Sequence, residues 1–367
     1  MSFCESGAAE PGTALTRLAS VPEWKRSPMK PVLKPLSEQV IVITGASSGI
    51  GLETARSAAR QGAKVVLVSR DDAALRRIVA EITAASGTAD AYAADVGDAD
   101  AVRAAAGHAS QRFGRIDTWV NNVGSAIYGR LLDIPDDEHE QLFRTNYFGM
   151  VHGCRAAVPH LRRAGGALIT IGSIASDMPS PLMGAYAATK HAEKAYVDAL
   201  RMELGEEGVP IVVTLIKPSG IDTPVAQHAI NHAGGEAQVP PPVYGPALVA
   251  DAILFCATHP RRDLTVGGAG RAQALFAAHF PHLFDRLAPK AAASFVDPAR
   301  KQPRPGNLFA STGTGRVRSG EHPAARRTSL YTAAAKHPAV TSAVAAAVAA
   351  GVGAFVYGRR DREDDPS

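Results

Sequence analysis

Two side chains capable of proton chemistry stand four residues apart in the stretch YAATK, which contains Tyr186 and Lys190. Four residues are just over one helical turn, so on a helix both side chains share a face. A phenol can give or take a proton during a reaction, and a neighbouring ammonium favours its ionised form. The alternative is an ordinary surface pair on a helix, and the surrounding sequence distinguishes the two.

A glycine-rich turn is the second chemical feature. The apolar run Val40–Thr44 leads directly into GASSGIG, from Gly45 to Gly51, and a helical pattern follows. A strand, a glycine turn and a helix N-terminus together bind pyrophosphate through free backbone N–H groups and the helix dipole. The spacing is GxxxGxG rather than GxGxxG, and a glycine turn alone can be only a tight turn. In this context we predict a nucleotide-binding turn.

The end of the next apolar run indicates which nucleotide. A dinucleotide site usually places an acidic residue there to hold a free ribose hydroxyl. This chain has Ser69 followed by Arg70, and a guanidinium suits a 2′-phosphate by charge and geometry. The sequence therefore favours NADP(H) over NAD(H). The alternative is that Arg70 begins an exposed helix and pairs with Asp71 or Asp72.

The elements that position these residues alternate in type along the chain. Short continuous apolar runs, typical of buried parallel strands, are separated by longer helical patterns. This alternation predicts an α/β fold, a Rossmann-type doubly wound parallel sheet of about seven strands with helices on both faces. The expected strands are Val40–Thr44, Lys64–Ser69, Asp90–Asp95, Ile116–Asn122, Ala167–Gly172, Ile211–Lys217 and Asp263–Gly268. The expected helices are 50–61, 72–86, 98–113, 136–163, 185–206 and 246–259.

Composition bounds the functional class. The 367 residues are 46% hydrophobic with a net charge of only +4. No long basic run with interleaved aromatics occurs, so we expect no nucleic-acid partner. The three cysteines, Cys4, Cys154 and Cys256, are far apart and suggest neither a disulfide framework nor a metal site. The N-terminus does not read as a secretory signal, so we expect a cytoplasmic protein.

The motifs, taken in order, resemble those of the short-chain dehydrogenase/reductase family. TGASSGIG is similar to the family's TGxxxGIG, and NNVG to its NNAG, with Val123 in place of alanine. Ser173 lies thirteen residues before the tyrosine of YxxxK, as in the family. KPSGIDTP resembles the family's Pro-Gly segment, except that Ser219 stands where glycine is usual. The resemblance covers roughly residues 38–270.

This resemblance implies a catalytic set and a cofactor site. In it Tyr186 is the general acid/base, and Lys190 also binds the nicotinamide ribose. Ser173 donates to the substrate oxygen, and Asn146 holds a water that links the lysine to solvent. No metal is needed. The expected cofactor-binding residues are Gly45, Ser47, Ser48, Gly49, Ile50, Gly51, Ser69, Arg70, Asp95, Val96, Asn122, Gly124, Tyr186, Lys190, Pro218, Gly220 and Thr223.

The predicted activity is that of an NADP(H)-dependent oxidoreductase interconverting a carbonyl and a secondary alcohol. The segments Ser176–Ala185 and Val225–Tyr244 carry little charge and predict an apolar substrate pocket. An alternative is an NADP-sensing regulatory protein without turnover, which would not need the four catalytic residues together. An epimerase or dehydratase is a third alternative, although such relatives usually have a larger substrate domain. The resemblance further implies a homodimer or homotetramer that pairs through the helices carrying Asn146 and YxxxK.

The expected domain organisation has five parts. Residues 1–37 form a disordered lead, with Met29 as an alternative start, and 38–285 form the catalytic Rossmann domain. A basic flexible linker is expected over 286–337. The uncharged run within 338–358 has valines every four residues and about the length of a bilayer-spanning helix. It is either a membrane anchor or an Ala-rich helix that packs on protein, and 359–367 form a charged tail.

Overall fold

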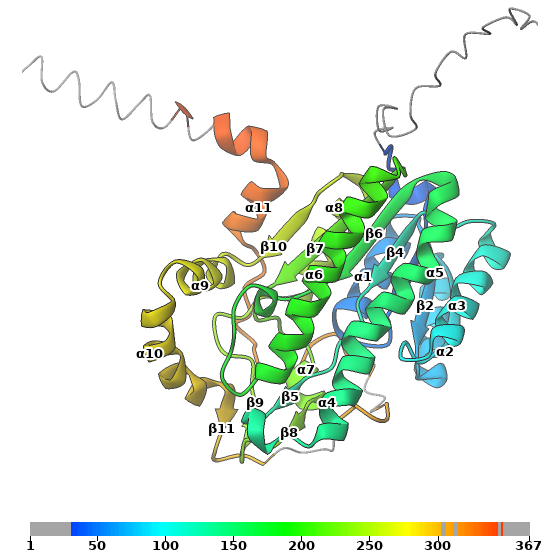
Figure 1. The fold of residues 1–367 in the computed structure, drawn as a ribbon. Coiled ribbons are helices and arrows are strands. Elements are labelled where there is room, and N and C mark those ends of the chain that lie inside the picture. The colour runs from blue at the N-terminus through cyan, green and yellow to red at the C-terminus, as the bar shows by residue number, and fades with distance from the viewer. Residues whose placement is uncertain (1–30, 302–305, 312–314, 344–345, 348–367) are drawn as a thin grey trace, which may run out of the picture.

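A seven-stranded parallel sheet forms the centre of the computed structural model, which describes residues 31–301, 306–311, 315–343 and 346–347. The strand order is β10-β7-β6-β4-β1-β2-β3, and each neighbouring pair is parallel (Figure 1). The predicted Rossmann-type fold is confirmed. The strands are β1 (Val40–Thr44), β2 (Lys64–Ser69), β3 (Thr88–Ala93), β4 (Thr118–Asn121), β6 (Gly166–Ile171), β7 (Ile211–Pro218) and β10 (Asp263–Val266).

Helices cover both faces of the sheet, which is why the central strands are apolar throughout (Figure 1). One hydrophobic core joins the sheet to α1, α2 and α8, represented by Leu52, Leu75 and Ile253. A second core joins the other face to α3, α5 and α6, represented by Val102, Leu161 and Val197. These helices are α1 (Gly49–Arg60), α2 (Asp72–Ala84), α3 (Ala99–Phe113), α5 (Gly149–Ala164), α6 (Gly184–Glu206) and α8 (Pro246–Thr258).

The helix expected over 136–163 is interrupted. It consists of α4 (Asp136–Phe143), a π-helical turn at Arg144–Phe148, and α5. A π-helical turn inserts extra backbone into a helix and is frequent at functional sites. Here it contains Asn146, one of the predicted catalytic residues. The apolar period of the sequence does not reveal this local change of winding.

The region beyond β10 contacts the Rossmann domain. The described residues of 286–337, expected to form a basic flexible linker, include several that are buried. Leu308, Ser319 and Thr332 are all buried. The elements beyond β10 are α9 (Gly268–His279), α10 (Pro281–Ala291), η6 (Ala292–Phe295), β11 (Val296–Asp297) and α11 (Leu330–Lys336). Basic residues of this region form ion pairs with the domain: Arg300–Glu236, Arg318–Asp222 and Lys336–Asp251.

Smaller elements frame the cleft above the sheet. They are η2 (Leu36–Glu38), β5 (Ile127–Tyr128), η3 (Leu131–Asp133), η5 (Ile174–Ser176), α7 (Val225–His228), β8 (Ile230–Asn231) and β9 (Glu236–Ala237). β5 pairs with β8, and β9 pairs with β11. The first ladder joins the segment around 127 to the segment around 230, and the second joins the segment around 236 to the C-terminal region.

Both chain ends extend past the described ranges. Near the start of the described residues, Lys34 pairs with Asp117 at 3.3 Å, so contacts with the domain occur before residue 38. Residues 1–30 and most of the hydrophobic run 338–358, together with the tail, lie outside the described residues. Within the described ranges, no helix has the length and apolar character needed to cross a membrane. The membrane anchor therefore stays a prediction.

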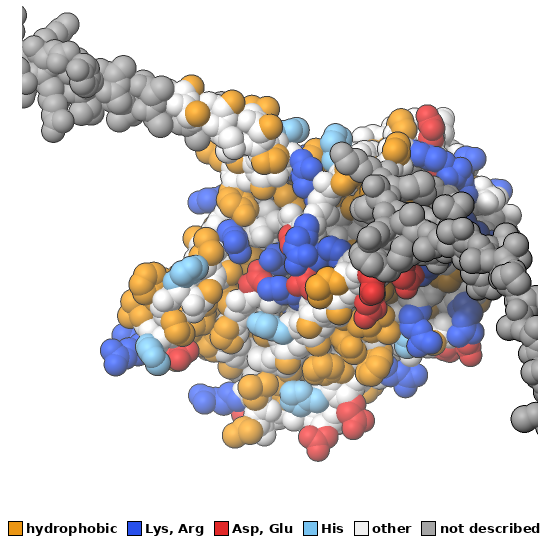
Figure 2. All heavy atoms as spheres, turned by 45° about the horizontal axis from the view of Figure 1, so that its top comes forward, with side chains coloured by type: hydrophobic (Ala, Val, Ile, Leu, Met, Phe, Trp, Pro, Cys, Tyr) orange, Lys and Arg blue, Asp and Glu red, His pale blue; other side chains and the backbone are white. Residues whose placement is uncertain are grey.

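The surface carries intermingled charges. On the face in Figure 2, basic and acidic side chains adjoin one another, with hydrophobic side chains around them. Ion pairs of this kind include Arg262 with Asp198 at 2.9 Å and with Asp263 at 3.1 Å. Such exposed pairs contribute little to stability individually.

Candidate active site

One cavity of about 580 Å³ gathers the predicted site residues at the carboxyl ends of the parallel strands. This is the edge at which doubly wound sheets bind ligands. Of the predicted residues, Gly51 and Asn146 do not border the cavity. Those that do are Gly45, Ser47, Ser48, Gly49, Ile50, Ser69, Arg70, Asp95, Val96, Asn122, Gly124, Ser173, Tyr186, Lys190, Pro218, Gly220 and Thr223.

The glycine turn is shaped by close backbone approaches. Gly45 has φ +67°, a conformation that favours glycine. A Cβ on Gly51 would lie 2.3 Å from the Gly45 carbonyl oxygen, so only glycine fits. Asn122 Nδ2 donates to the carbonyls of Thr44 at 3.0 Å and Gly45 at 3.3 Å. The close approach of Gly51 and the hydrogen bonds of the Asn122 amide thus fix the conformation of the turn. Gly49 borders the cavity, and a Cβ added there would lie 3.5 Å from Thr223.

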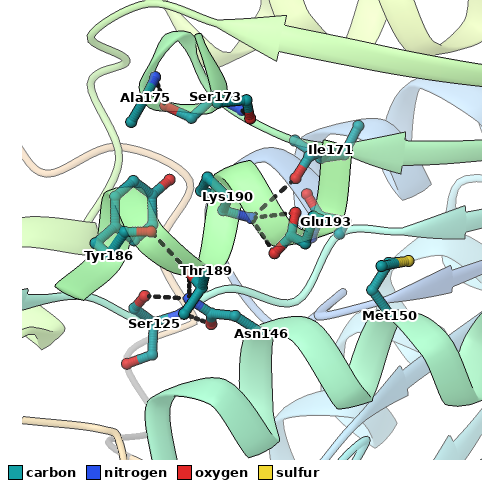
Figure 3. Close-up of polar contacts among 12 residues, drawn as sticks. Ser125, Asn146, Met150, Ile171, Ser173, Ala175, Tyr186, Thr189, Lys190 and Glu193 are labelled. Carbon is teal, nitrogen blue, oxygen red and sulfur yellow. Dashed lines mark hydrogen bonds and ion pairs between the residues drawn. The ribbon is translucent and has the colours of Figure 1, made fainter. Parts of the chain in front are cut away.

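Tyr186 and Lys190 lie on successive turns of α6 and both border the cavity, as the YxxxK spacing predicts (Figure 3). Lys190 Nζ lies 5.7 Å from the centre of the Tyr186 ring. The lysine is 3% exposed, and its ammonium donates to the Ile171 carbonyl at 3.1 Å. It also donates to both oxygens of Glu193, at 2.9 and 3.0 Å. The ammonium is therefore held on the cavity side of the helix by fixed partners.

Ser173 follows β6 and lies across the cavity from α6 (Figure 3). Its Oγ accepts from the Ala175 N–H at 3.1 Å and caps the short helix η5. A hydroxyl that accepts one bond still has its own hydrogen to donate. The capping contact therefore orients Ser173 and is compatible with donation to a substrate oxygen.

Asn146 lies behind the cavity in the π-helical turn and is 1% exposed. Its Oδ1 accepts from the Ser125 N–H at 2.8 Å, and its Nδ2 donates to the Ser125 carbonyl and to Thr189 Oγ1, both at 3.0 Å. Thr189 in turn donates to the Tyr186 carbonyl at 2.8 Å (Figure 3). The side chain thus joins the Ser125 loop to α6 beside Lys190. The water-holding role of Asn146 stays a prediction.

A C-terminal strap, which we define as residues 306–311 and 315–319, contacts the nucleotide end of the cavity. Arg70 donates to the carbonyls of Asn307 at 2.5 Å and Leu308 at 3.3 Å, and not to Asp71 or Asp72 as the alternative supposed. The Gly49 N–H donates to the Arg316 carbonyl at 2.9 Å. The strap could not be predicted from the sequence, because its irregular backbone gives no helical or strand period.

Asp222 anchors the strap. This carboxylate is 1% exposed and lies beside Thr223 in the KPSGIDTP segment. It accepts from Arg318 Nε at 2.7 Å and from both the N–H and the hydroxyl of Ser319. A carboxylate in this segment, shortly after a buried strand, was the signal in the sequence that could have indicated a buried polar contact.

Glu193 is the second functional residue that the sequence analysis missed. Burial raises the pKa of its carboxyl to about 7, with the Lys190 charge opposing that shift. For Lys190, burial lowers the pKa of the ammonium, but the charges of Glu193 and Tyr186 outweigh it, so the net direction is upward. Burial thus shifts the Glu193 carboxyl toward its protonated form, while the neighbouring charges keep Lys190 as an ammonium. Glu193 falls on the same helix face as YxxxK, which its spacing of three from Lys190 indicates.

The end of the cavity beyond the catalytic side chains is apolar. The two segments predicted to determine specificity contribute Met178, Met183, Val225 and Val239. The helices α9 and α10, not expected from the sequence, contribute Phe276, Phe284 and Leu287. No charged side chain is among these residues, in agreement with an apolar pocket.

Comparison with known proteins assigns the family. The sequence model of the short chain dehydrogenase family matches residues 39–233. The chain is 41% identical over 319 residues to the uncharacterized oxidoreductase YxnA of Bacillus subtilis, covering 86% of this chain and 90% of that protein. It is 33% identical to dehydrogenase/reductase SDR family member 7B of Bos taurus, covering 68% and 79%.

Similar solved structures support the same family assignment. A short-chain dehydrogenase/reductase from Burkholderia phymatum in complex with NAD has a TM-score of 0.62 and 26% identity, covering 68% of this chain and 96% of that chain. A metagenomic short-chain oxidoreductase in complex with NADP has a TM-score of 0.53 and 30% identity, covering 64% and 98%. The chain belongs to the short-chain dehydrogenase/reductase family of oxidoreductases, and the resemblance drawn from its motifs is confirmed.

Proposed function

We propose that the protein is an NADP(H)-dependent oxidoreductase that interconverts a carbonyl and a secondary alcohol, with Tyr186 as the general acid/base. The observation that carries this proposal is the grouping of Tyr186, Lys190 and Ser173 around one cavity that is continuous with the glycine turn. A regulatory NADP sensor would need the glycine turn but no proton-transfer set.

The residues at the nucleotide end fit a dinucleotide. Only glycine fits at position 51, and the close approach there leaves the backbone at the start of α1 open to a pyrophosphate. Ser69 offers no carboxylate to a ribose hydroxyl. Arg70 has five N–H donors, and its two hydrogen bonds with the strap leave others for a 2′-phosphate. This supports NADP over NAD. The similar solved structures include one in complex with NAD and one in complex with NADP.

NADP(H), when bound, supplies or accepts the hydride. The chain supplies the proton and the positioning. Tyr186 donates its phenolic proton to the substrate oxygen in reduction and takes it back in oxidation. The Lys190 ammonium, 5.7 Å from the ring centre, favours the phenolate that remains after donation. The Ser173 hydroxyl, oriented by Ala175, donates to the same substrate oxygen and stabilises its developing charge.

The apolar end of the cavity supports an apolar substrate. Phe276, Phe284 and Leu287 of α9 and α10 give a carbonyl compound an apolar wall, and no Lys or Arg of these two helices borders the cavity. A homodimer or homotetramer, by likeness to the family, and membrane attachment through 338–358 are further parts of this proposal.

The test uses the purified full chain with NADPH or NADH and a panel of apolar ketones and aldehydes. Loss of the reduced nicotinamide absorbance with NADPH, abolished in Tyr186→Phe, is the expected result. Tight NADPH binding without turnover across the panel would favour the sensor. A clear preference for NADH would overturn the assignment of NADP.

A further inference from the structure

A buried carboxylate contacts the catalytic lysine in an arrangement that the proposed reaction does not yet use. Glu193 is 1% exposed and lies three residues after Lys190 on α6. Its two oxygens accept from Lys190 Nζ at 2.9 and 3.0 Å (Figure 3). The third partner of the ammonium is the Ile171 carbonyl at the end of β6. These three acceptors match the three N–H donors of an ammonium.

This geometry fixes both the place and the net charge of the lysine. A buried ammonium without a partner would be strongly unfavourable, so the carboxylate stabilises it. Because both carboxylate oxygens contact Nζ, they also restrict the positions that the flexible Lys190 side chain can give its ammonium. When Glu193 is ionised the pair is neutral, and when Glu193 is protonated the pair carries one positive charge next to Tyr186.

The other groups facing Glu193 come from three elements. Tyr186 lies on its own helix, and its charge also acts on Lys190. Cys154 of α5 faces it, and burial raises the pKa of that thiol to about 12, so it stays neutral near pH 7. Asn121 of β4 donates to the Cys154 sulfur, and Met150 of α5 lies nearby (Figure 3). Among the described residues, Lys190 is the cation that contacts this carboxylate.

We propose that Glu193 is a positioning residue for the reaction: its buried carboxylate holds the Lys190 ammonium beside Tyr186, and its protonation state sets the net charge of the pair. This inference rests on the proposed roles of Tyr186 and Lys190.

The consequence is a dependence on pH in the neutral range. Burial raises the pKa of Glu193 to about 7, so both forms of the pair are populated near that pH. Below it the pair is positive and favours the phenolate form of a nearby tyrosine. Above it the pair is neutral and that effect weakens. A purely structural partner for Lys190 would change stability without adding this step.

The experiment compares the wild-type full chain with Glu193→Gln. Glutamine keeps the shape and one acceptor but does not titrate. Glu206→Gln is the matched control, because Glu206 is an exposed glutamate on the same helix. Two quantities are followed across the neutral pH range: NADPH affinity, by nicotinamide fluorescence, and kcat/KM for reduction of the best ketone of the panel.

We expect the wild type and Glu206→Gln to show a step of about tenfold in kcat/KM or in NADPH affinity, centred near neutral pH. A tenfold step corresponds to a difference of about one unit in the pKa of Glu193 between the two states compared. Glu193→Gln is expected to lack the step. A folded Glu193→Gln protein with the wild-type profile, or a wild type without the step, overturns the proposal.

If Glu193→Gln does not fold, Glu193→Asp provides the test. Aspartate keeps the charge but is one methylene shorter, so it is expected to retain the step while lowering kcat. A folded Glu193→Asp protein with the wild-type kcat, or one without the step, overturns the proposal. A wild type that binds no NADPH and turns over no ketone refutes the proposed function instead, whereas NADPH binding or turnover without the step refutes only the role of Glu193.

Discussion

Removing the Asp222 carboxylate tests whether the C-terminal strap is an integral part of the folded domain. Asp222→Ala deletes an acceptor that is 1% exposed and serves Ser319 through two bonds and Arg318 through one. Hydrogen bonds to a charged group contribute about 1.5–3 kcal/mol each. The Arg318 side chain is 43% exposed, so water replaces much of that bond. We therefore expect the free energy of unfolding to fall by about 3–5 kcal/mol.

Asp222→Asn should have a graded effect. Its remaining oxygen can keep both bonds to Ser319, but its amide places a donor opposite the donating Arg318. The expected loss is about 1–2 kcal/mol. Urea unfolding followed by tryptophan fluorescence measures both losses, and hydrogen exchange over 306–319 reports whether the strap has detached.

The control is Asp251→Asn, which removes a 61% exposed partner of Lys336. An exposed pair of this kind is expected to cost less than about 1 kcal/mol. If Asp222→Ala were no more destabilising than Asp251→Asn, and exchange over the strap were unchanged, the assignment of Asp222 as its anchor would be refuted.

Three further perturbations follow from the site. Arg70→Gln should raise KM for NADPH by about 10-fold or more with little change for NADH, because one charge-assisted bond to a phosphate is lost; equal effects in steady-state assays with the two cofactors would contradict this role. Gly51→Ala places a Cβ 2.3 Å from the Gly45 carbonyl and should cost about 1–3 kcal/mol in urea unfolding, whereas Gly107→Ala, with nothing within 4 Å, should be neutral or stabilising. Ser173→Ala should lower kcat by about 10²-fold with NADPH affinity unchanged by fluorescence titration, and an unchanged kcat would exclude donation to the substrate.

The sheet and its covering helices were predictable because their signals are local. Short runs rich in β-branched residues, such as Val40–Thr44 and Lys64–Ser69, favour buried strands by their length and composition, and both have those bounds in the structure. The same holds for the spacing of Tyr186 and Lys190 on α6. The glycine turn could be predicted because a strand, glycines and the start of a helix follow one another directly in the sequence.

Features that depend on contacts between distant residues were not predictable. The strap binds through backbone carbonyls, as at Asn307 and Leu308 with Arg70, and carbonyls carry no sequence signal. The buried Glu193 looks in the sequence like any charged residue of an exposed helix. The packing of α6 against β7, η5 and the π-helical turn Arg144–Phe148, which the sequence does not show, covers this face of the helix. The π-helical turn at Asn146 likewise depends on tertiary contacts with Ser125 and Thr189.

The central claim is that Tyr186 provides the proton while a hydride passes between NADP(H) and a substrate carbon. The most direct measurement uses NADPH carrying deuterium at the transferring position of its nicotinamide ring and the best ketone of the panel. The account predicts deuterium on the carbinol carbon of the alcohol with wild type, and none with Tyr186→Phe, although that variant still binds NADPH. Deuterium transfer at the wild-type rate by Tyr186→Phe would contradict it.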